Sequence, residues 1–350
     1  MKKRKKHKKY ISSFIILFIL LVGAGYYFLF GSKNNSKDTK SSDDISSTSS
    51  VEEKSLKIID ITSKTRPYAI MINNLSVARP YQSGLQEAYI VYELIVEGGI
   101  TRFLALYKDA DVERIGSIRS ARHYYLDYAL ENDAIYVHWG QSPQAAADFK
   151  SLGVTEISDR SMASTWSFRD RNINVSSEHT LFGLMSGLDK VRDKKISRKT
   201  SDKKLLLNYS IDEYNYEGEA ANEITINYSK IMTAKYEFDN ENKVYARSVN
   251  GKEHVDYVTK KQYTFKNIIA YEIRNYDFMG AGNKGRQEIE NIGSGSGYYF
   301  SNGIATKIKW SKSSRSAQTK YETEDGKELI VNDGNTFIQI YPQKGSLSFK

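Results

Sequence analysis

The chain has 350 residues, enough for about two domains, and a formal net charge of +9. Seven of these positive charges lie in the first nine residues, which leaves +2 for the rest of the chain and excludes the basic face expected of a nucleic-acid-binding domain. The sequence contains no cysteine, which excludes disulfides, thiolate catalysis and a lipidated cysteine.

The N-terminus predicts a membrane anchor. Residues 1–9 form a basic tip, and residues 10–30 are an uncharged, mainly apolar run. As a helix this run would be about 31 Å long, which matches a hydrocarbon core of about 30 Å. The basic tip should stay in the cytoplasm, so we expect a single-pass protein of the cell membrane whose bulk is extracellular. A cleaved signal peptide is the alternative, although its apolar core is usually shorter.

The next two regions differ sharply in composition. Residues 31–56 are rich in Ser, Asn, Lys and Asp and predict a flexible linker. Residues 57–200 carry strand and helix patterns in turn, which predict a mixed α/β first domain. Within it, Ser142 is expected to cap a short helix, and a further helix is expected over residues 177–193.

The second half of the chain predicts a different architecture. After a charged connection over residues 194–222, residues 223–345 contain short β-rich segments separated by Asn, Asp and Gly turns. This pattern predicts a mainly antiparallel β second domain, so the predicted fold class is α+β. The glycine-rich residues 279–300 lack the strand–helix context of a phosphate loop and are expected to form a long loop.

The run YELIVEGGITRF, residues 92–103, places two glutamates and an arginine around a Gly-Gly pair. A two-residue loop at the glycines predicts a hairpin with Glu93, Glu97 and Arg102 on one face and Arg102 diagonally between the carboxylates. The two glutamate Cα atoms would be about 13 Å apart, whereas glycosidase carboxyl pairs are about 5–9.5 Å apart. An ion network, a polar ligand site and a hydrolytic pair are the open interpretations, in that order of preference.

More ionisable residues follow this run. Arg119 and Arg122 flank Ser120, which is expected to cap a helix over residues 121–133, and a helix N-terminus beside guanidinium groups is a seat for an anion. The alternative is that these arginines pair with Glu93 and Glu97 in one internal ion network. His138 ends a strand and is a candidate general base or partner of a ligand hydroxyl. No nucleophile-elbow, metal-binding, phosphate-loop or dinucleotide motif is present, so no metal or cofactor is expected.

Several motifs carry a family resemblance. EGGITRFLALY, RIGSIRSAR and AIYVHWGQSPQA resemble the first domain of YerB-like lipoproteins of Gram-positive bacteria, and GNKGRQEIENIGSGSGYYFSNG with DGKELIVNDGNTFIQI resembles their second domain. The resemblance covers about residues 60–345 and implies a membrane-tethered, extracytoplasmic protein with two domains and no catalytic roles to transfer. The matching motif positions are Glu93, Glu97, Gly98, Gly99, Thr101, Arg102, Arg119, Ser120, Arg122, His138, Gly140 and Ser142. Ala24 stands where the family has its lipidated cysteine, so a helical anchor is expected instead.

Two functional hypotheses follow. The first is a binding or accessory module of the cell envelope, whose partner is a polar or anionic envelope polymer or a membrane or wall protein. Its candidate ligand-binding residues are Glu93, Glu97, Arg102, Arg119, Arg122, His138 and Ser142. The alternative is a peptidoglycan-active hydrolase that uses Glu97 or Glu93 as general acid and His138 as base. Whether the chain is an enzyme stays open, and no nucleic-acid partner is expected.

Overall fold

The computed structural model describes residues 55–158, 160–280 and 283–350, which belong to one compact unit. The predicted anchor, residues 10–30, and nearly all of the predicted linker lie outside the described residues. Among the described residues, none of the helices has the length and apolar character needed to span a membrane.

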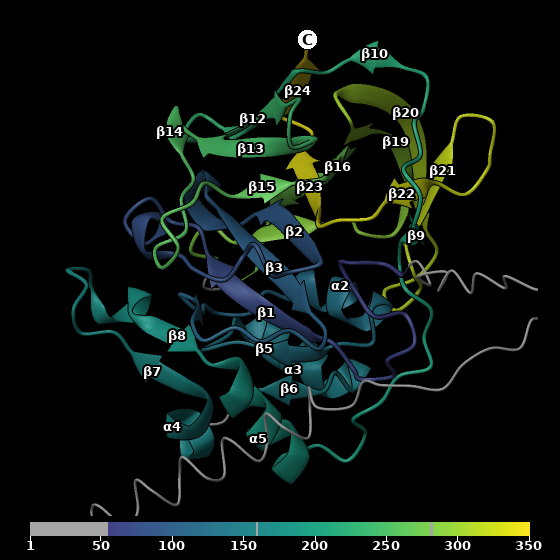
Figure 1. Ribbon diagram of the computed structural model, residues 1–350. Helices are drawn as coiled ribbons and strands as arrows, with labels where there is room; N and C mark the ends of the chain where they lie inside the picture. The colour runs from purple at the N-terminus through teal and green to yellow at the C-terminus, as the bar shows by residue number, and fades with distance from the viewer. Residues whose placement is uncertain (1–54, 159, 281–282) are drawn as a thin grey trace, which may run out of the picture. The chain divides into compact units, whose positions relative to one another are not determined.

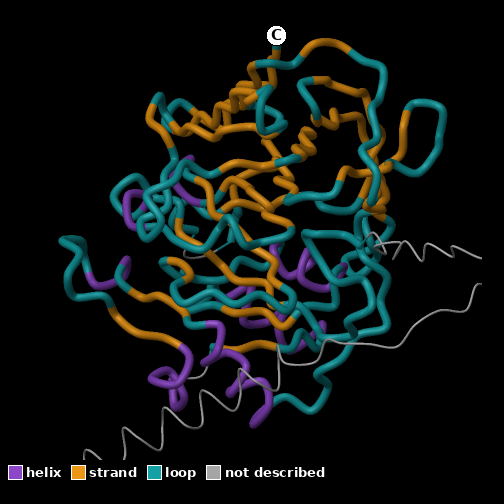
Figure 2. The backbone as a smooth tube through the Cα atoms, viewed as in Figure 1, coloured by secondary structure: helices purple, strands orange, loops and turns teal. Residues whose placement is uncertain are grey.

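The N-terminal segment, residues 57–200, combines short strands with short helices. Its strands are β1 (Tyr68–Asn73), β2 (Ile90–Ile95), β3 (Thr101–Tyr107), β4 (Ile115–Gly116), β5 (Ile135–Val137), β6 (Glu156–Ile157), β7 (Ser167–Arg169) and β8 (Leu181–Gly183). Its helices are α2 (Tyr125–Glu131), α3 (Pro143–Leu152), α4 (Ala163–Trp166) and α5 (Met185–Lys195), with 3-10 turns at Arg79–Tyr81, Glu97–Gly99, Arg160–Met162 and Ser177–His179. Figure 2 shows the helices gathered around the strands of this segment, and in the described part of the chain none follows α5.

The C-terminal segment, residues 223–345, consists of strands and turns. The connection before it contains β9 (Asn208–Ser210) and β10 (Glu219–Ala220). The following strands are β11 (Glu223–Ser229), β12 (Met232–Asp239), β13 (Val244–Val249), β14 (Lys252–Glu253), β15 (Thr264–Phe265), β16 (Asn267–Ile273), β17 (Asn275–Asp277), β18 (Gln287–Ile289), β19 (Gly293–Ser301), β20 (Ile304–Lys312), β21 (Lys320–Thr323), β22 (Ile330–Asn332), β23 (Thr336–Pro342) and β24 (Ser346–Phe349).

One 11-stranded sheet runs through both segments (Figure 1). Its order is β10-β20-β19-β16-β23-β2-β3-β1-β5-β6, with β21 beside β20. β23 lies between β16 and β2 and is parallel to both, so a strand of the C-terminal segment pairs directly with the N-terminal segment. Every residue of β1, β2 and β3 is buried, which explains why these strands are mainly apolar on both faces. The two predicted domains therefore contribute to a single sheet.

A second sheet, β14-β13-β12-β11-β24 with β15 beside β13, is antiparallel throughout. Residues of β11 and β13 alternate between buried and partly exposed, as expected when one face of a sheet packs on the core. The fold-class prediction is confirmed, because the N-terminal segment is a mixed sheet with few helices and the C-terminal segment is mainly antiparallel β.

The predicted register of the β2–β3 hairpin is wrong by one residue. The hairpin loop has three residues, Glu97–Gly99, and both of its glycines have positive φ angles, 67° and 75°. As a result, Glu93 lies opposite Phe103 and Leu94 lies opposite Arg102. Since a shift of one residue moves a side chain to the other face of a strand, Arg102 lies on the face opposite Glu93 and not between the two glutamates.

The structure confirms one predicted helix start and corrects two others. Ser142 caps α3, and its Oγ accepts a hydrogen bond from the backbone N of Ala145 at 3.1 Å. α2 begins only at Tyr125, without a side-chain cap, so Ser120 lies in the segment before the helix and the predicted anion seat at a helix N-terminus is wrong. α5 begins at Met185 rather than at residue 177, because β8 occupies the preceding residues.

The predicted long loop over residues 279–300 is also wrong from residue 287 onward, where β18 and most of β19 lie. Glycine and serine are poor strand formers by intrinsic preference, so the sequence pattern favours a loop here. Cross-strand pairing of β19 with β16 and β20 overrides that preference.

Candidate functional site

Glu93 lies at the centre of a fully buried polar network. Its Oε2 accepts hydrogen bonds from Arg247 Nη2 at 2.8 Å and from Gln339 Nε2 at 3.0 Å. Its Oε1 accepts from Thr101 Oγ1 at 2.6 Å and from Asn74 Nδ2 at 3.1 Å. Both side chains of the Glu93–Arg247 ion pair are 0% exposed. Four donors therefore satisfy the carboxylate inside the protein, which identifies Glu93 as a structural group.

Arg247 joins this network from β13 in the C-terminal segment. Its Nε donates to Tyr236 Oη at 3.1 Å, and its Nη1 donates to His254 Nδ1 at 2.7 Å. His254 therefore carries its proton on Nε2, which donates to Gln82 Oε1. Burial and the positive charges of Arg247 and Arg79 hold the pKa of His254 well below its usual value. One sequence signal was available, because alternation along β13 places Arg247 on the same face as buried Tyr245 and Val249.

Glu97 forms a second ion cluster with Arg102 and Arg122 at the tip of the β2–β3 hairpin. Glu97 Oε1 accepts from Arg122 Nε at 2.5 Å, and Oε2 lies 3.5 Å from Arg102 Nη2. Arg102 Nη1 also donates to Ser120 O at 2.7 Å, and Arg122 Nη1 donates to Ala121 O at 2.7 Å. Burial opposes ionisation of Glu97, but the hydrogen bond from Arg122 and the charges of both arginines lower the pKa of Glu97.

We call Arg102, Arg119 and Arg122 the arginine cluster, because these three guanidinium groups face only two carboxylates. Arg119 Nη2 pairs with Glu178 Oε2 at 2.9 Å, and the Glu178 side chain is 57% exposed. The Nε atoms of Arg102 and Arg119 are buried without a hydrogen-bond partner in the described part of the chain. Burial, followed by the charge of Arg122, lowers the pKa of Arg102 to about 10. The cluster therefore carries an excess of positive charge and two unused donors.

His138 and Ser142 occupy structural positions outside this cluster. His138 is 1% exposed, with Nδ1 at 2.8 Å from Gly140 O and Nε2 at 2.6 Å from Glu156 Oε2. Its ring stacks on Phe149 with the ring centroids 4.8 Å apart. The hydrogen bond from His138 also lowers the pKa of Glu156. Because both ring nitrogens have partners and Ser142 caps α3, neither side chain presents a free group to a ligand.

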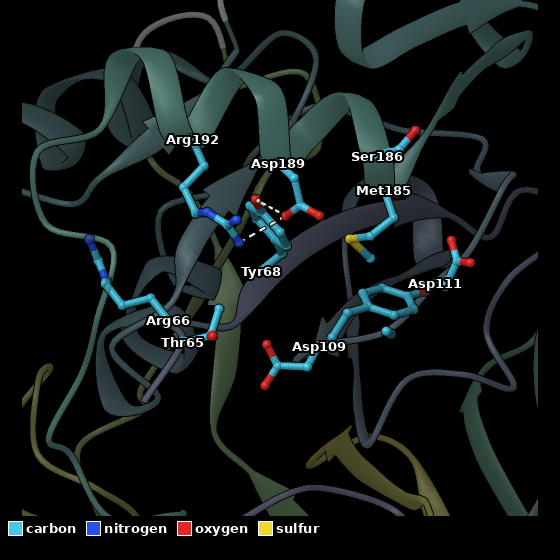
Figure 3. Close-up of a pocket in the computed structure, with 11 residues that line it drawn as sticks. Thr65, Arg66, Tyr68, Asp109, Asp111, Met185, Ser186, Asp189 and Arg192 are labelled. Atoms are coloured by element: carbon cyan, nitrogen blue, oxygen red, sulfur yellow. Dashed lines mark hydrogen bonds and ion pairs between the residues drawn. The ribbon is translucent and has the colours of Figure 1, made fainter. Parts of the chain in front are cut away.

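A separate polar hollow of about 310 Å³ lies between β1, the residues after β3, and α5 (Figure 3). Its most connected group is Asp189, whose Oδ1 accepts from Tyr68 Oη at 2.9 Å and pairs with Arg192 Nη1 at 2.8 Å. Asp109 and Asp111 line the same hollow. Arg66 and Arg192 line it as well, so three carboxylates stand against two guanidinium groups and the lining carries a small excess of negative charge.

The predicted site residues are thus divided between three places: the Glu93 network, the arginine cluster with Glu97, and the contacts of His138 and Ser142. In residues 55–158, 160–280 and 283–350, no group of three or more His, Asp or Glu side chains is arranged to hold a metal ion. Of the three places, only the arginine cluster combines partial exposure with unsatisfied donors, and it is the candidate functional site.

The fold and its ion clusters define a protein of two segments joined by one sheet. The chain belongs to the DUF3048 family, described as "Protein of unknown function", which likewise has an N-terminal and a C-terminal domain. The model of its N-terminal domain matches residues 56–202, and the model of its C-terminal domain matches residues 224–338.

The chain is similar to a curated relative and to a solved structure from Bacillus subtilis. It is 29% identical over 301 residues to "Putative lipoprotein YerB" of strain 168, covering 84% of this chain and 86% of that protein. The crystal structure of the YerB protein superposes with a TM-score of 0.71 at 27% identity, covering 81% of this chain and 94% of that chain. The resemblance to YerB-like proteins expected from the sequence motifs is confirmed.

Proposed function

We propose that this protein is a membrane-anchored binding module of the cell envelope, which recognises an anionic group at the arginine cluster. The observation that carries the proposal is the charge imbalance of the cluster, with three guanidinium groups against Glu97 and Glu178. An anion that approached Arg119 and Arg122 would remove this imbalance.

The side-chain chemistry supports an oxyanion such as a phosphate or carboxylate group. Arginine presents a planar fork of donors that pairs with two oxygens at once, and it is more weakly hydrated than lysine. The side chains of Arg119 and Arg122 are 20% and 12% exposed, so both are held by the fold and still reach solvent. Rigid, partly desolvated guanidinium groups bind an anion with less loss of side-chain entropy than freely moving surface groups.

Membrane attachment on the outer side of the membrane is the second part of the proposal. The basic tip, the apolar run over residues 10–30 and the linker over residues 31–56 support it. The relative from Bacillus subtilis is named a lipoprotein, which also supports an envelope location. Since Ala24 stands in the cysteine position and the chain has no cysteine, we assign the anchoring role here to the apolar run.

The observations do not favour the alternative hydrolase. Glu93 is completely buried with four hydrogen-bond donors around its carboxylate, and Glu97 is engaged by Arg122 and Arg102. His138 has both ring nitrogens bonded. A general acid must reach the substrate, and a base needs a free lone pair, so these three residues lack the access that such chemistry requires.

Binding of the purified full-length protein to sodium polyphosphate tests the proposal. We expect Arg119→Gln and Arg122→Gln together to weaken binding by about tenfold or more, because each removes a charged donor. Arg198→Gln is the matched control, since Arg198 is also paired with a carboxylate, Asp133, but lies outside the cluster. Parent binding should weaken as salt is raised, because mobile ions screen the partly exposed guanidinium groups. Equal affinity of the parent and the double variant would overturn the proposed site.

A further inference from the structure

We propose that the end of the large sheet at β16, β19 and β23 binds an uncharged saccharide chain, at a site separate from the arginine cluster. A hollow of about 550 Å³ opens here between the last residues of β16 and β23 and the first residues of β19. Its volume falls within the range of about 300–1,000 Å³ typical of small-molecule sites. Its lining combines aromatic rings, small residues and polar groups.

The floor of this hollow is the strip Gly293–Gly297, in which glycine alternates with serine. Close packing requires two of the glycines. A Cβ on Gly295 would lie 2.7 Å from Trp310 Nε1, and a Cβ on Gly297 would lie 2.6 Å from Ala270 O. The two glycines therefore make room for the Trp310 indole and for the backbone of Ala270, so this part of the lining consists of backbone, small side chains and the edge of an aromatic ring.

Trp310 supplies an unsatisfied donor at the same place. The residue is 5% exposed and lines the hollow, and its Nε1 has no hydrogen-bond partner among the described residues. The Nε1 edge of the ring packs against Gly295 at the border of the hollow. A buried indole N–H normally has an acceptor, and Trp310 lines the hollow, so a ligand hydroxyl that reached its Nε1 would satisfy a group that the protein leaves unpaired.

Two tyrosines provide the aromatic part of the lining. Tyr298 and Tyr341 are both partly exposed, and Tyr298 is held against Phe349 with the ring centroids 5.0 Å apart. Burial, followed by the nearby charge of Glu272, raises the pKa of Tyr341 to about 12, so its hydroxyl stays protonated and can donate. A tyrosine ring packs against the C–H face of a sugar, and its hydroxyl bonds to the sugar edge.

The charges around the hollow favour a neutral ligand. Glu272 is exposed, and Glu290 pairs with Arg274 at 3.3 Å, so two carboxylates stand against one guanidinium group. This balance repels a polyanion, which is the opposite of the arginine cluster. Carboxylate oxygens are acceptors, and a saccharide carries many hydroxyl donors, so a polyhydroxyl chain without charge matches the lining best.

Titration of the full-length protein with chitotetraose and with maltotetraose, two uncharged tetrasaccharides, tests this inference. We expect at least one to bind, and we expect Glu272→Ala and Tyr341→Ala each to weaken binding by about tenfold. Tyr214→Ala removes an aromatic ring that is 41% exposed outside the hollow and should bind as the parent does.

Glu272 is exposed on its strand, so its substitution keeps the test valid even where loss of Tyr341 disturbs folding. Absence of binding by both tetrasaccharides would overturn the inference. If Glu272→Ala bound the tetrasaccharide as tightly as the parent protein does, the inference would also fail, because the saccharide would then bind away from that carboxylate. A loss of polyphosphate binding in Glu272→Ala would also contradict a separate, neutral site.

Discussion

The buried Glu93–Arg247 pair makes a sharp prediction about stability. The substitution Arg247→Met keeps much of the side-chain volume but leaves the Glu93 carboxylate buried without its cation. Both side chains are 0% exposed, so no water can replace the lost charge. Removing one partner of such a pair costs about 3–5 kcal/mol, a large part of a typical unfolding free energy of about 5–15 kcal/mol. With a urea m-value of about 3 kcal/mol per M, the unfolding midpoint should fall by about 1–1.7 M.

Urea unfolding followed by tryptophan fluorescence measures this loss. Trp139 and Trp166 report on the N-terminal segment, and Trp310 reports on the C-terminal segment. Because β23 pairs directly with β2, we expect a single transition in which both segments unfold together.

Two comparisons isolate the buried pair. Lys235→Met removes an ion pair with Glu223 on the neighbouring strand, where both side chains are about one-third exposed, and should barely move the midpoint. The double variant Glu93→Leu, Arg247→Met should be more stable than Arg247→Met alone, because no unpaired charge remains buried. A loss of about 1 kcal/mol or less for Arg247→Met, the value typical of an exposed pair, would refute this reasoning.

Two further predictions concern acid and packing. His254 has a pKa held well below 6.5 in the folded chain, so the unfolded chain binds the extra proton first. The contribution of His254 to the free energy of unfolding is therefore complete above about pH 6.5 and falls by about 1.4 kcal/mol per pH unit below it. Urea titrations at decreasing pH should show that the free energy of unfolding falls more steeply in the parent than in His254→Asn. Gly187→Ala places a Cβ 2.1 Å from Thr165 O, so we expect the free energy of unfolding to fall by about 1–3 kcal/mol and the Tm to fall with it. Ser186 is exposed on the same helix, and Ser186→Ala should have the Tm of the parent.

The sequence predicts the strands well because the pattern of apolar residues is local. The β-rich segments that form β11 and β13 and the cap at Ser142 depend on neighbours a few residues away, and the structure confirms them. The hairpin register was missed for a physical reason. Every residue of β2 is buried, so its two faces carry the same apolar signal, and a Gly-Gly pair fits either a two-residue or a three-residue loop.

The composition of the site depends on long-range contacts that no local pattern contains. Arg247 bonds Glu93 across 154 residues of sequence, and Gln339 does so across 246. By contrast, Arg122 and Glu97 are only 25 residues apart, and their grouping was among the sequence-based expectations. The sequence motifs group these charged residues, and the fold decides which of them face inward.

The position of β23 also has a consequence for how the chain folds. This strand ends at Pro342, near the C-terminus, yet it lies between β2 and β16 in the large sheet. During synthesis from the N-terminus, β2 therefore has an unpaired edge until almost the whole chain has emerged. Contacts so distant in sequence slow folding, and an open edge invites pairing with other chains. We expect deletion of residues 336–350 to leave the N-terminal segment prone to aggregation, rather than folded as an independent domain.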